Sequence, residues 1–306
     1  MAKTTPTIAR ATAQNEGDFN SFDWALFLGV SLIWGASFLL IAEALEGLTP
    51  GMITLGRVGF GALTLLVFRA FSSDLPKIDA EDRKTVVLLS FLWVAIPFTL
   101  FPLAQEHINS AVTGLLNGAM PVFAGVVSAL LVKVVPTGVQ RAGIVVGFAG
   151  ILLISLGSVS GGNSTELRGV LMVLAATVCY GFAVNVAAPL LAKYGAVVLM
   201  GSVISMATLW VLPLGLRNFD ENQWSFGPIL AVVFLGAVGT GAAYWIMATL
   251  VSRVGPVRAS FITYLIPVVS LALGVTIRND EVQLLAIVGA VLTIGGALLA
   301  SRKVSS

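Results

Sequence analysis

Few side chains in this sequence could carry acid–base, nucleophilic or metal chemistry. The 306 residues include one histidine and one cysteine. The sequence holds no motif of a zinc protease, a serine hydrolase or a phosphate-binding loop. With so few ligand and nucleophile types, hardly any way remains to build a metal or nucleophile site. We therefore expect no enzyme, no metal and no cofactor.

The most informative charges are those within apolar runs, because a charge in lipid is expensive and tends to mark function. Arg57 lies inside the run at 50–71, and Glu43 lies near the end of the run before it. Two interpretations stay open. The two side chains form an ion pair that locks a helical hairpin, or Arg57 binds a substrate carboxylate, which a guanidinium can hold with two hydrogen bonds.

Proton coupling has little support in the sequence. Proton-coupled carriers usually place carboxylates or histidines along their pathway. The histidine, His107, lies beside Glu106 in a short loop, and no apolar run contains Asp. We interpret this pair as solvated loop residues, with a proton-accepting role as the alternative. Facilitated movement down a gradient is equally compatible with the sequence.

The elements that must position these residues are membrane helices. Hydrophobic residues make up 57% of the chain and charged residues 10%, and the mean hydropathy is +0.97. We expect an all-α integral membrane protein of ten helices, preceded by a disordered tail over 1–22 with no signal peptide. The apolar runs long enough to cross a bilayer are 24–45, 50–71, 84–103, 109–131, 139–157, 168–189, 196–216, 228–248, 256–276 and 284–301.

An internal repeat relates the two halves of the chain. Separate segments align without gaps at an offset of 146 residues: Pro121 with Pro267, Trp34-Gly35 with Tyr180-Gly181, Gly143 with Gly289, and Gly150 with Gly296. Each copy, 23–158 and 166–303, holds five helices, an odd number, so the second copy must be inverted in the membrane. Inverted repeats are typical of secondary transporters, which bind substrate near the midplane and open each side in turn.

Aromatic and small polar residues lie near the centres of the predicted helices, away from the interfaces where Trp and Tyr normally collect. Buried Tyr and Trp need hydrogen-bond partners, which a wet cavity provides. Packing is the alternative, because Ser and Thr in membrane helices commonly bond their own backbone. The expected substrate-cavity residues are Trp34, Ser37, Phe38, Trp93, Phe98, Thr113, Asn117, Tyr180, Asn185, Thr240, Tyr244, Trp245, Ser260 and Tyr264.

Three positions are candidates for hinges or gates. Pro121 and Pro267 fall in the middle of apolar runs, where proline frees a carbonyl one turn upstream. We expect both near the centre of the molecule, either as kinks that shape packing or as gates. Gly239, in the run GAVGTG at 236–241, is a hinge candidate because rocking halves need positions that absorb backbone change.

The basic residues predict the orientation, because short basic loops stay on the cytoplasmic side. If the N-terminus is cytoplasmic, the tails and loops on that side hold thirteen of the 17 Lys and Arg residues. The loops on the opposite side hold Arg168, Arg217 and Arg278. Both termini are therefore expected in the cytoplasm.

Four segments carry a resemblance to a known family: LIWGASF (32–38), NGAMPVFAGVVSALL (117–131), TYLIPVVSLALGV (263–275) and GAVLTIGGALLAS (289–301). Together with the two five-helix copies, they resemble the EamA-type branch of the drug/metabolite transporter superfamily, and within it the YddG-type exporters. The resemblance implies helices arranged around a central cavity. It also implies export of aromatic and other amino acids across the bacterial inner membrane.

We therefore interpret the chain as a secondary transporter that exports small amphipathic metabolites, foremost aromatic and other neutral amino acids, by alternating access. The alternative is an exporter of other drugs or metabolites, such as nucleobases, sugars or quaternary amines, on the same fold. A channel is disfavoured because no filter or ring of charges is visible. The expected partners are the substrate and the lipid bilayer, with no nucleic acid and no obligate protein partner.

Overall fold

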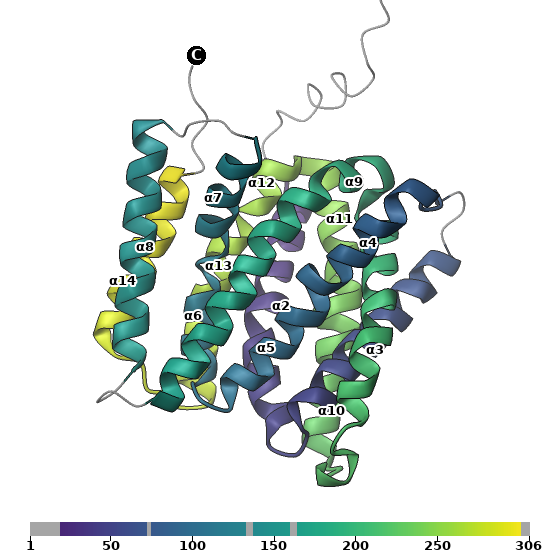
Figure 1. Cartoon of the computed structure of the whole chain (residues 1–306), viewed down its shortest axis with the longest axis horizontal. Helices are drawn as coiled ribbons and strands as arrows, with labels where there is room; N and C mark the ends of the chain where they lie inside the picture. Colours follow the sequence, from purple (N-terminus) through teal and green to yellow (C-terminus); the bar gives the residue numbers. More distant parts are fainter. Residues whose placement is uncertain (1–18, 72–74, 133–136, 160–163, 301–306) are drawn as a thin grey trace, which may run out of the picture.

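The computed structural model of the chain is a bundle of helices lying side by side (Figure 1). It describes residues 19–71, 75–132, 137–159 and 164–300, and no strand occurs in these ranges. Eight helical stretches are long and apolar enough to cross a bilayer. The chain is a multi-pass membrane protein.

The helices follow the apolar runs of the sequence. The first half forms α2 (Ser21–Leu45), α3 (Pro50–Ala70), α4 (Arg83–Leu89), α5 (Ile96–Gln105), α6 (Ser110–Asn117), α7 (Met120–Val132) and α8 (Gly138–Ser158). The second half forms α9 (Ser164–Leu216), α10 (Phe226–Gly236), α11 (Ala243–Val254), α12 (Pro256–Ser260), α13 (Ile262–Ile277) and α14 (Leu284–Ala300). A π-helical stretch, η2 (Ser90–Ala95), joins α4 to α5, and a second, η5 (Ala237–Ala242), joins α10 to α11.

The first helix begins slightly earlier than expected. Residues 1–18 of the predicted tail lie outside the described part of the chain, but helix α2 already begins at Ser21. The reason is a capping box: the backbone N–H of Asp23 donates to Asn20 Oδ1 at 2.9 Å, and that of Asn20 donates to Asp23 Oδ2 at 3.1 Å. Such a box satisfies backbone donors that the first turn leaves free.

Helix α9 turns back on itself at Gly195. Its 53 residues would extend about 80 Å as one straight helix, more than twice the thickness of a bilayer core. Gly195 has φ 76° and ψ 162°, a conformation that glycine adopts at little cost. The predicted spans 168–189 and 196–216 lie on either side of this residue.

Helices α8 and α14 pack closely along glycines at one edge of the bundle (Figure 1). A Cβ added to Gly150 would lie 2.5 Å from the carbonyl oxygen of Gly289, and a Cβ added to Gly289 would lie 2.6 Å from the carbonyl oxygen of Gly150. Small residues permit this approach, which supplies van der Waals contact where lipid provides no hydrophobic driving force.

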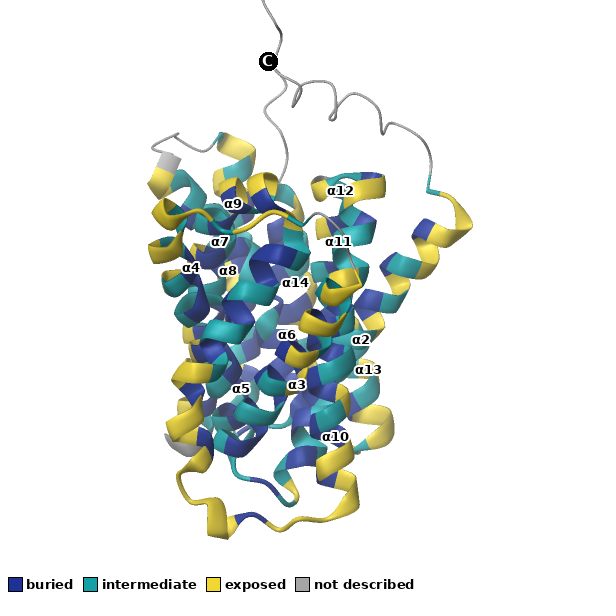
Figure 2. Ribbon diagram, turned by 90° about the vertical axis from the view of Figure 1, so that its right-hand side faces the viewer, coloured by how far each residue is buried: buried dark blue, intermediate teal, exposed yellow. Residues whose placement is uncertain are grey.

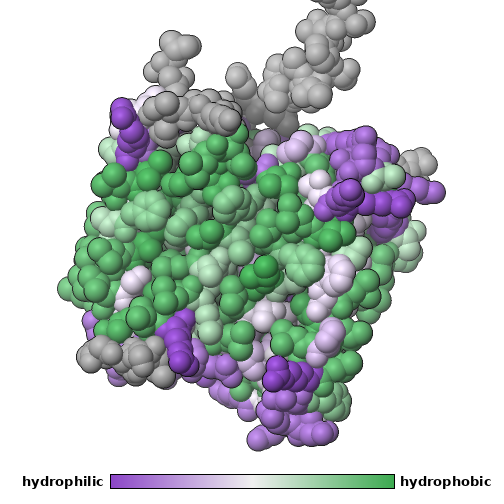
Figure 3. Space-filling view, in the orientation of Figure 1, coloured by the Kyte–Doolittle hydropathy of each residue, from purple (hydrophilic) through white to green (hydrophobic). Residues whose placement is uncertain are grey.

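Buried and apolar residues are distributed as expected for a helical bundle in a membrane. Buried residues face the inside of the bundle, and exposed residues gather on its flanks and at its ends (Figure 2). On the face drawn in Figure 3, apolar residues form a band between two polar ends. One end carries the turn at Gly195 together with residues 75–82, and the other carries the loop 46–49 and η4 (Phe219–Glu221). We name them the Gly195 end and the Glu46 end.

Candidate substrate site

Arg57 is the charged residue around which the site is built. Helix α3 begins at Pro50, capped by the side chain of Thr49, and Arg57 lies about two turns further along. Its side chain is almost fully buried, with 7% of the residue exposed. Nε donates to Thr240 Oγ1 at 3.2 Å, and Cζ lies 3.6 Å from the ring centroid of Phe98. This short distance to the ring is a cation–π contact.

The expected ion pair between Arg57 and Glu43 does not form. Glu43 instead pairs with Arg278, which also contacts Glu46 at 3.0 Å. Seven residues of helix, about 10 Å, separate Arg57 from the start of α3, whereas Glu43 lies about 3 Å from the end of α2. The two side chains therefore lie at different depths. In the described ranges, no carboxylate lies within ion-pair distance of Arg57.

Arg57 is held in place by two neighbouring elements. One turn earlier on α3, the hydroxyl of Thr54 lies 2.8 Å from the carbonyl oxygen of Pro50 and 3.1 Å from that of Phe98, so its one proton is shared between α3 and α5. Thr240, fully buried, accepts from Arg57 and donates to the carbonyl of Leu235, five residues earlier, at 3.1 Å.

The two π-helical stretches occupy related positions. Thr240 and the predicted hinge Gly239 both lie in η5. Adding the repeat offset of 146 to the bounds of η2 gives 236–241, one residue from the bounds of η5, 237–242. Stretches of π-helix are rare and often occur at functional sites, and η5 carries Thr240, the hydrogen-bond partner of Arg57.

Aromatic rings from several helices gather around Arg57. Trp34 of α2 and Tyr244 of α11 meet edge to face, with 5.7 Å between ring centroids. Tyr180 of α9 and Tyr244 both lie in the neighbourhood of the guanidinium of Arg57. These contacts bring predicted residues from both halves of the chain to one place.

Phe101 extends this group of rings and was not among the expected cavity residues. Its ring centroid lies 5.4 Å from that of Phe38 and 6.0 Å from that of Tyr180. Phe101 follows Phe98 by three residues on α5, so the two share one face of the helix. We name the whole group the central cluster: Trp34, Phe38, Arg57, Phe98, Phe101, Tyr180, Thr240 and Tyr244.

Three predicted cavity residues bond backbone instead of each other. Ser37 donates to the carbonyl of Ile33 at 3.2 Å, and Thr113 donates to that of Asn109 at 2.8 Å. The amide of Asn185 donates to the carbonyl of Ala124 at 3.0 Å and so joins α9 to α7. For these three residues, the packing interpretation describes the contacts that the structure contains.

Four further predicted residues make other contacts. Trp93 of η2 packs on the apolar core between α3, α4 and α9. Trp245 is 44% exposed and lies beside Phe68. Tyr264 pairs with Phe261 at 6.0 Å, and Ser260 is exposed. None of these four takes part in the ring contacts of the central cluster that the described residues make.

Asn117 and the two prolines meet where one helix is interrupted. Helix α6 ends at Asn117 and α7 begins at Met120. A Cβ added to Gly118 would lie 3.3 Å from Pro267 Cγ, while Pro121 falls in the first turn of α7. Asn117 Oδ1 is buried and has no hydrogen-bond partner. It is therefore a free acceptor inside the bundle.

A cleft opens at the Glu46 end. It has a volume of about 700 Å³ and is lined by residues 45–51 together with Gln105, Arg217 and Gln223. Both amide atoms of Gln105 are buried without partners. The cleft lies at the end of the bundle, and none of the eight members of the central cluster lines it.

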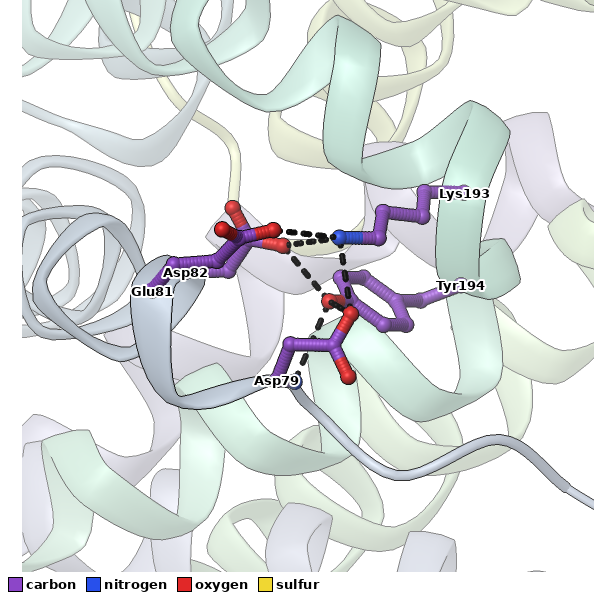
Figure 4. A network of polar contacts seen from close by, with 5 residues as sticks. All are labelled: Asp79, Glu81, Asp82, Lys193 and Tyr194. Atoms are coloured by element: carbon purple, nitrogen blue, oxygen red, sulfur yellow. Dashed lines mark hydrogen bonds and ion pairs between the residues drawn. The ribbon is translucent and has the colours of Figure 1, made fainter.

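An ion-pair network closes the Gly195 end (Figure 4). Lys193 Nζ lies 2.8 Å from Asp79 Oδ2, 2.7 Å from Asp82 Oδ2 and 3.4 Å from Glu81 Oε1. The hydroxyl of Tyr194 lies 2.5 Å from Asp82 Oδ2 and accepts from the backbone N–H of Asp79. Hydrogen bonds from Lys193 and then Tyr194 hold the pKa of Asp79 below its usual value.

The sequence comparison decides the family. A model of the EamA-like transporter family matches residues 24–156 and again residues 167–302. The chain belongs to the EamA-like transporter family.

Two curated relatives match nearly the whole chain. The chain is 28% identical over 276 residues to "Uncharacterized transporter YdfC" of Bacillus subtilis (strain 168), covering 89% of each chain. It is 25% identical to "Probable terminal-alkyne amino-acid exporter" of Streptantibioticus cattleyicolor (strain ATCC 35852 / DSM 46488 / JCM 4925 / NBRC 14057 / NRRL 8057), covering 92% of this chain and 93% of the relative. A solved crystal structure superposes with a TM-score of 0.63 at 22% identity, over 92% of this chain and 97% of the other, and so shares the fold.

Proposed function

We propose that this EamA-like transporter exports small amphipathic metabolites, foremost aromatic and other neutral amino acids, across the bacterial inner membrane by alternating access. The observation that carries the proposal is the central cluster, in which rings from both halves of the chain lie together with one buried cation. Aromatic rings favour a solute with an apolar body through stacking and dispersion. Asn117 Oδ1, a buried acceptor without a partner, suits the amino group of such a solute.

The proposal includes an arrangement of ten membrane helices as two inverted five-helix repeats, 23–158 and 166–303. The double match of the family model supports it. Contacts that recur at the repeat offset support it as well. A Cβ added to Gly35 would meet the side chain of Val269, and a Cβ added to Gly181 would meet Phe123. Since 35 + 146 = 181 and 269 − 146 = 123, the two contacts are related by the repeat.

Related joints at the two ends support alternating access. At the Glu46 end, the N–H of Thr49 donates to Asn222 Oδ1 at 2.8 Å, and that of Gln223 donates to the carbonyl of Gly47 at 2.7 Å. The offset maps the loop 46–49 onto 192–195, which contains Lys193 of the ion-pair network. A carrier whose two repeats exchange roles needs contacts of this kind, which can close one side of the bundle, at each end.

The orientation follows from the basic residues, and we place the Gly195 end in the cytoplasm. Short basic loops are retained there. The described Lys and Arg residues at this end are Arg69, Lys77, Arg83, Lys84, Arg141, Lys193, Arg253 and Arg258. The Glu46 end has Arg168, Arg217 and Arg278. Export as the direction of transport is supported by the name of the Streptantibioticus relative, an amino-acid exporter.

The test is uptake of radiolabelled phenylalanine, threonine, glutamate and lysine into proteoliposomes, with and without an imposed pH gradient. We expect saturable uptake of phenylalanine and threonine without a gradient. Trp34→Ala should slow phenylalanine uptake more than threonine uptake, because it removes a ring of the central cluster. Trp224→Ala, which changes a tryptophan with 52% exposure, is the matched control. Uptake of nucleobases, sugars or quaternary amines but of no amino acid would overturn the substrate assignment.

A further inference from the structure

The lack of a counter-ion for Arg57 supports an inference that rests on the proposed function and deepens it. We propose that Arg57 is the carboxylate-binding residue of the carrier and that a transported solute must bear a free carboxylate. Thr240 Oγ1 then holds the position of a substrate oxygen while the carrier is empty.

The hydrogen bonds of Arg57 leave room for a ligand. Its guanidinium has five N–H donors, and the contact of Nε with Thr240 uses one of them. In the described part of the chain, Nη1 and Nη2 donate to no protein acceptor. A planar carboxylate accepts two parallel bonds from such a fork, which the single hydroxyl of Thr240 cannot do.

The energetics favour the exchange of Thr240 for a carboxylate. A buried charge without a counter-ion is costly, and the cation–π contact with Phe98 and the hydrogen bond to Thr240 compensate only part of that cost. A bound carboxylate supplies the missing charge inside the bundle. Among the described residues, no carboxylate competes for Arg57, and Glu43 is already paired with Arg278.

The site is single and directional, although the fold is repeated. At the repeat offset, Arg57 corresponds to Val203 and Thr240 corresponds to Val94. Both valines are fully buried in the apolar core. The carrier therefore offers one anion position, on the side of α3 and η5, and a solute binds with its carboxylate toward Arg57 and its side chain toward the rings.

The test compares four ligands that differ only in their polar groups: phenylalanine, 3-phenylpropionate, phenylalaninamide and phenethylamine. Each competes with labelled phenylalanine for uptake into proteoliposomes. We expect phenylalaninamide to compete at least about tenfold more weakly than phenylalanine, and phenethylamine at least about tenfold more weakly than 3-phenylpropionate, the size of a lost charge-assisted hydrogen bond. Equal competition by phenylalaninamide would overturn the proposal.

Variants assign the effect to Arg57. Arg57→Met should remove the preference for carboxylates, and Arg57→Lys should keep part of it, because an ammonium retains the charge but not the fork. Arg168→Met, which changes an exposed arginine, is the matched control and should retain the full preference. If Arg57→Met fails to fold, the ligand series on the unmodified protein decides by itself.

A binding measurement separates this proposal from the proposed function. A ligand that binds the folded state raises the melting temperature of the purified protein. Stabilisation by 3-phenylpropionate but not by phenethylamine, without any amino-acid flux, would support the carboxylate site and contradict amino-acid export. Flux of phenylalanine together with equal stabilisation by both compounds would support amino-acid export and contradict the carboxylate site.

Discussion

Lys193 and Arg57 carry the same charge in opposite surroundings. The side chain of Lys193 is 43% exposed and has three carboxylates within 3.4 Å, whereas Arg57 is buried beside aromatic rings. An exposed ion pair of this kind serves the structure, while an uncompensated buried cation is suited to a ligand. The difference between the two residues therefore lies in their partners and not in their chemistry.

The network around Lys193 makes the stability of the protein depend on pH. Because the pKa of Asp79 is lowered by Lys193 and Tyr194 from 3.8, its stabilising contribution is complete above that value and is lost as the pH falls through the folded-state pKa. Lys193→Met should therefore lower the melting temperature at neutral pH, and this difference from the unmodified protein should narrow below pH 3.8.

Thermal unfolding followed by tryptophan fluorescence, from about pH 7 down to about pH 3, measures this effect. Lys84→Met is the matched control, because Lys84 is exposed at the same end and makes none of the contacts of the network. A difference between Lys193→Met and the unmodified protein that stays constant over the whole pH range would contradict the role of Asp79.

Single residues differed in how far the sequence could predict them. Arg57 was recognisable because a lone charge within an apolar run is unusual. The pair of Arg57 with Glu43, one of the two interpretations, does not form, because Glu43 pairs with Arg278, which lies 235 residues away in the sequence and reaches it only in the folded chain. Asp79 and Lys193 are 114 residues apart (193 − 79) and look like ordinary loop charges. Phe101 resembles any lipid-facing phenylalanine until the fold brings Phe38 to it.

At the scale of elements, the contact of α8 with α14 sets a strict limit on side-chain size. Gly150→Leu would place a side chain against the backbone of Gly289, which cannot move aside as a flexible side chain could. We expect a loss of stability of about 1–3 kcal/mol, as in other overpacked interiors. A lower melting temperature of the purified variant measures it.

Gly29→Leu is the control for this prediction. A Cβ added to Gly29 of α2 meets no atom within 4 Å, so this substitution should leave the melting temperature unchanged or raise it, because leucine is the better helix former. Equal melting temperatures for the Gly150→Leu variant and the unmodified protein would show that the two helices are not packed as described.

The elements themselves were largely predictable, and their irregularities were not. Each predicted apolar run lies in a helical stretch, because twenty apolar residues in lipid have hardly another way to satisfy their backbone. The π-helical geometry of η2 and η5 leaves no comparable signal, although the glycine run at 236–241 marked η5 as a hinge candidate. The interruption after Asn117 depends on the packing of Gly118 against Pro267, which is a tertiary contact.

At the scale of the whole molecule, the unequal distribution of basic residues predicts which end faces the cytoplasm. With Cys179→Ala as background, Ser225→Cys reports on the Glu46 end and Lys84→Cys reports on the Gly195 end. A membrane-impermeant maleimide applied to intact cells should label Ser225→Cys and not Lys84→Cys. The reverse pattern would contradict the orientation, and labelling after cell lysis shows that both cysteines can react.

The repeat was the feature of the whole molecule that the sequence revealed most clearly. Residues spaced by 146 positions, such as Gly143 and Gly289, are matched in type because both face the same kind of contact. The asymmetry that the proposed carboxylate site requires is also visible in this comparison, since Arg57 has only Val203 as its counterpart. The substrate could not be predicted from the sequence alone. The side chains proposed to bind it come from six separate elements and meet only in the folded chain.

The central claim is that the chain is a carrier of amino acids, and counterflow tests it most directly. Proteoliposomes are loaded with unlabelled phenylalanine and diluted into a trace of labelled phenylalanine. An alternating-access carrier exchanges the two, so we predict that labelled phenylalanine accumulates transiently above its equilibrium level, and that this overshoot is lost with Arg57→Met. Labelled phenylalanine that enters no faster into loaded than into empty proteoliposomes would contradict the account.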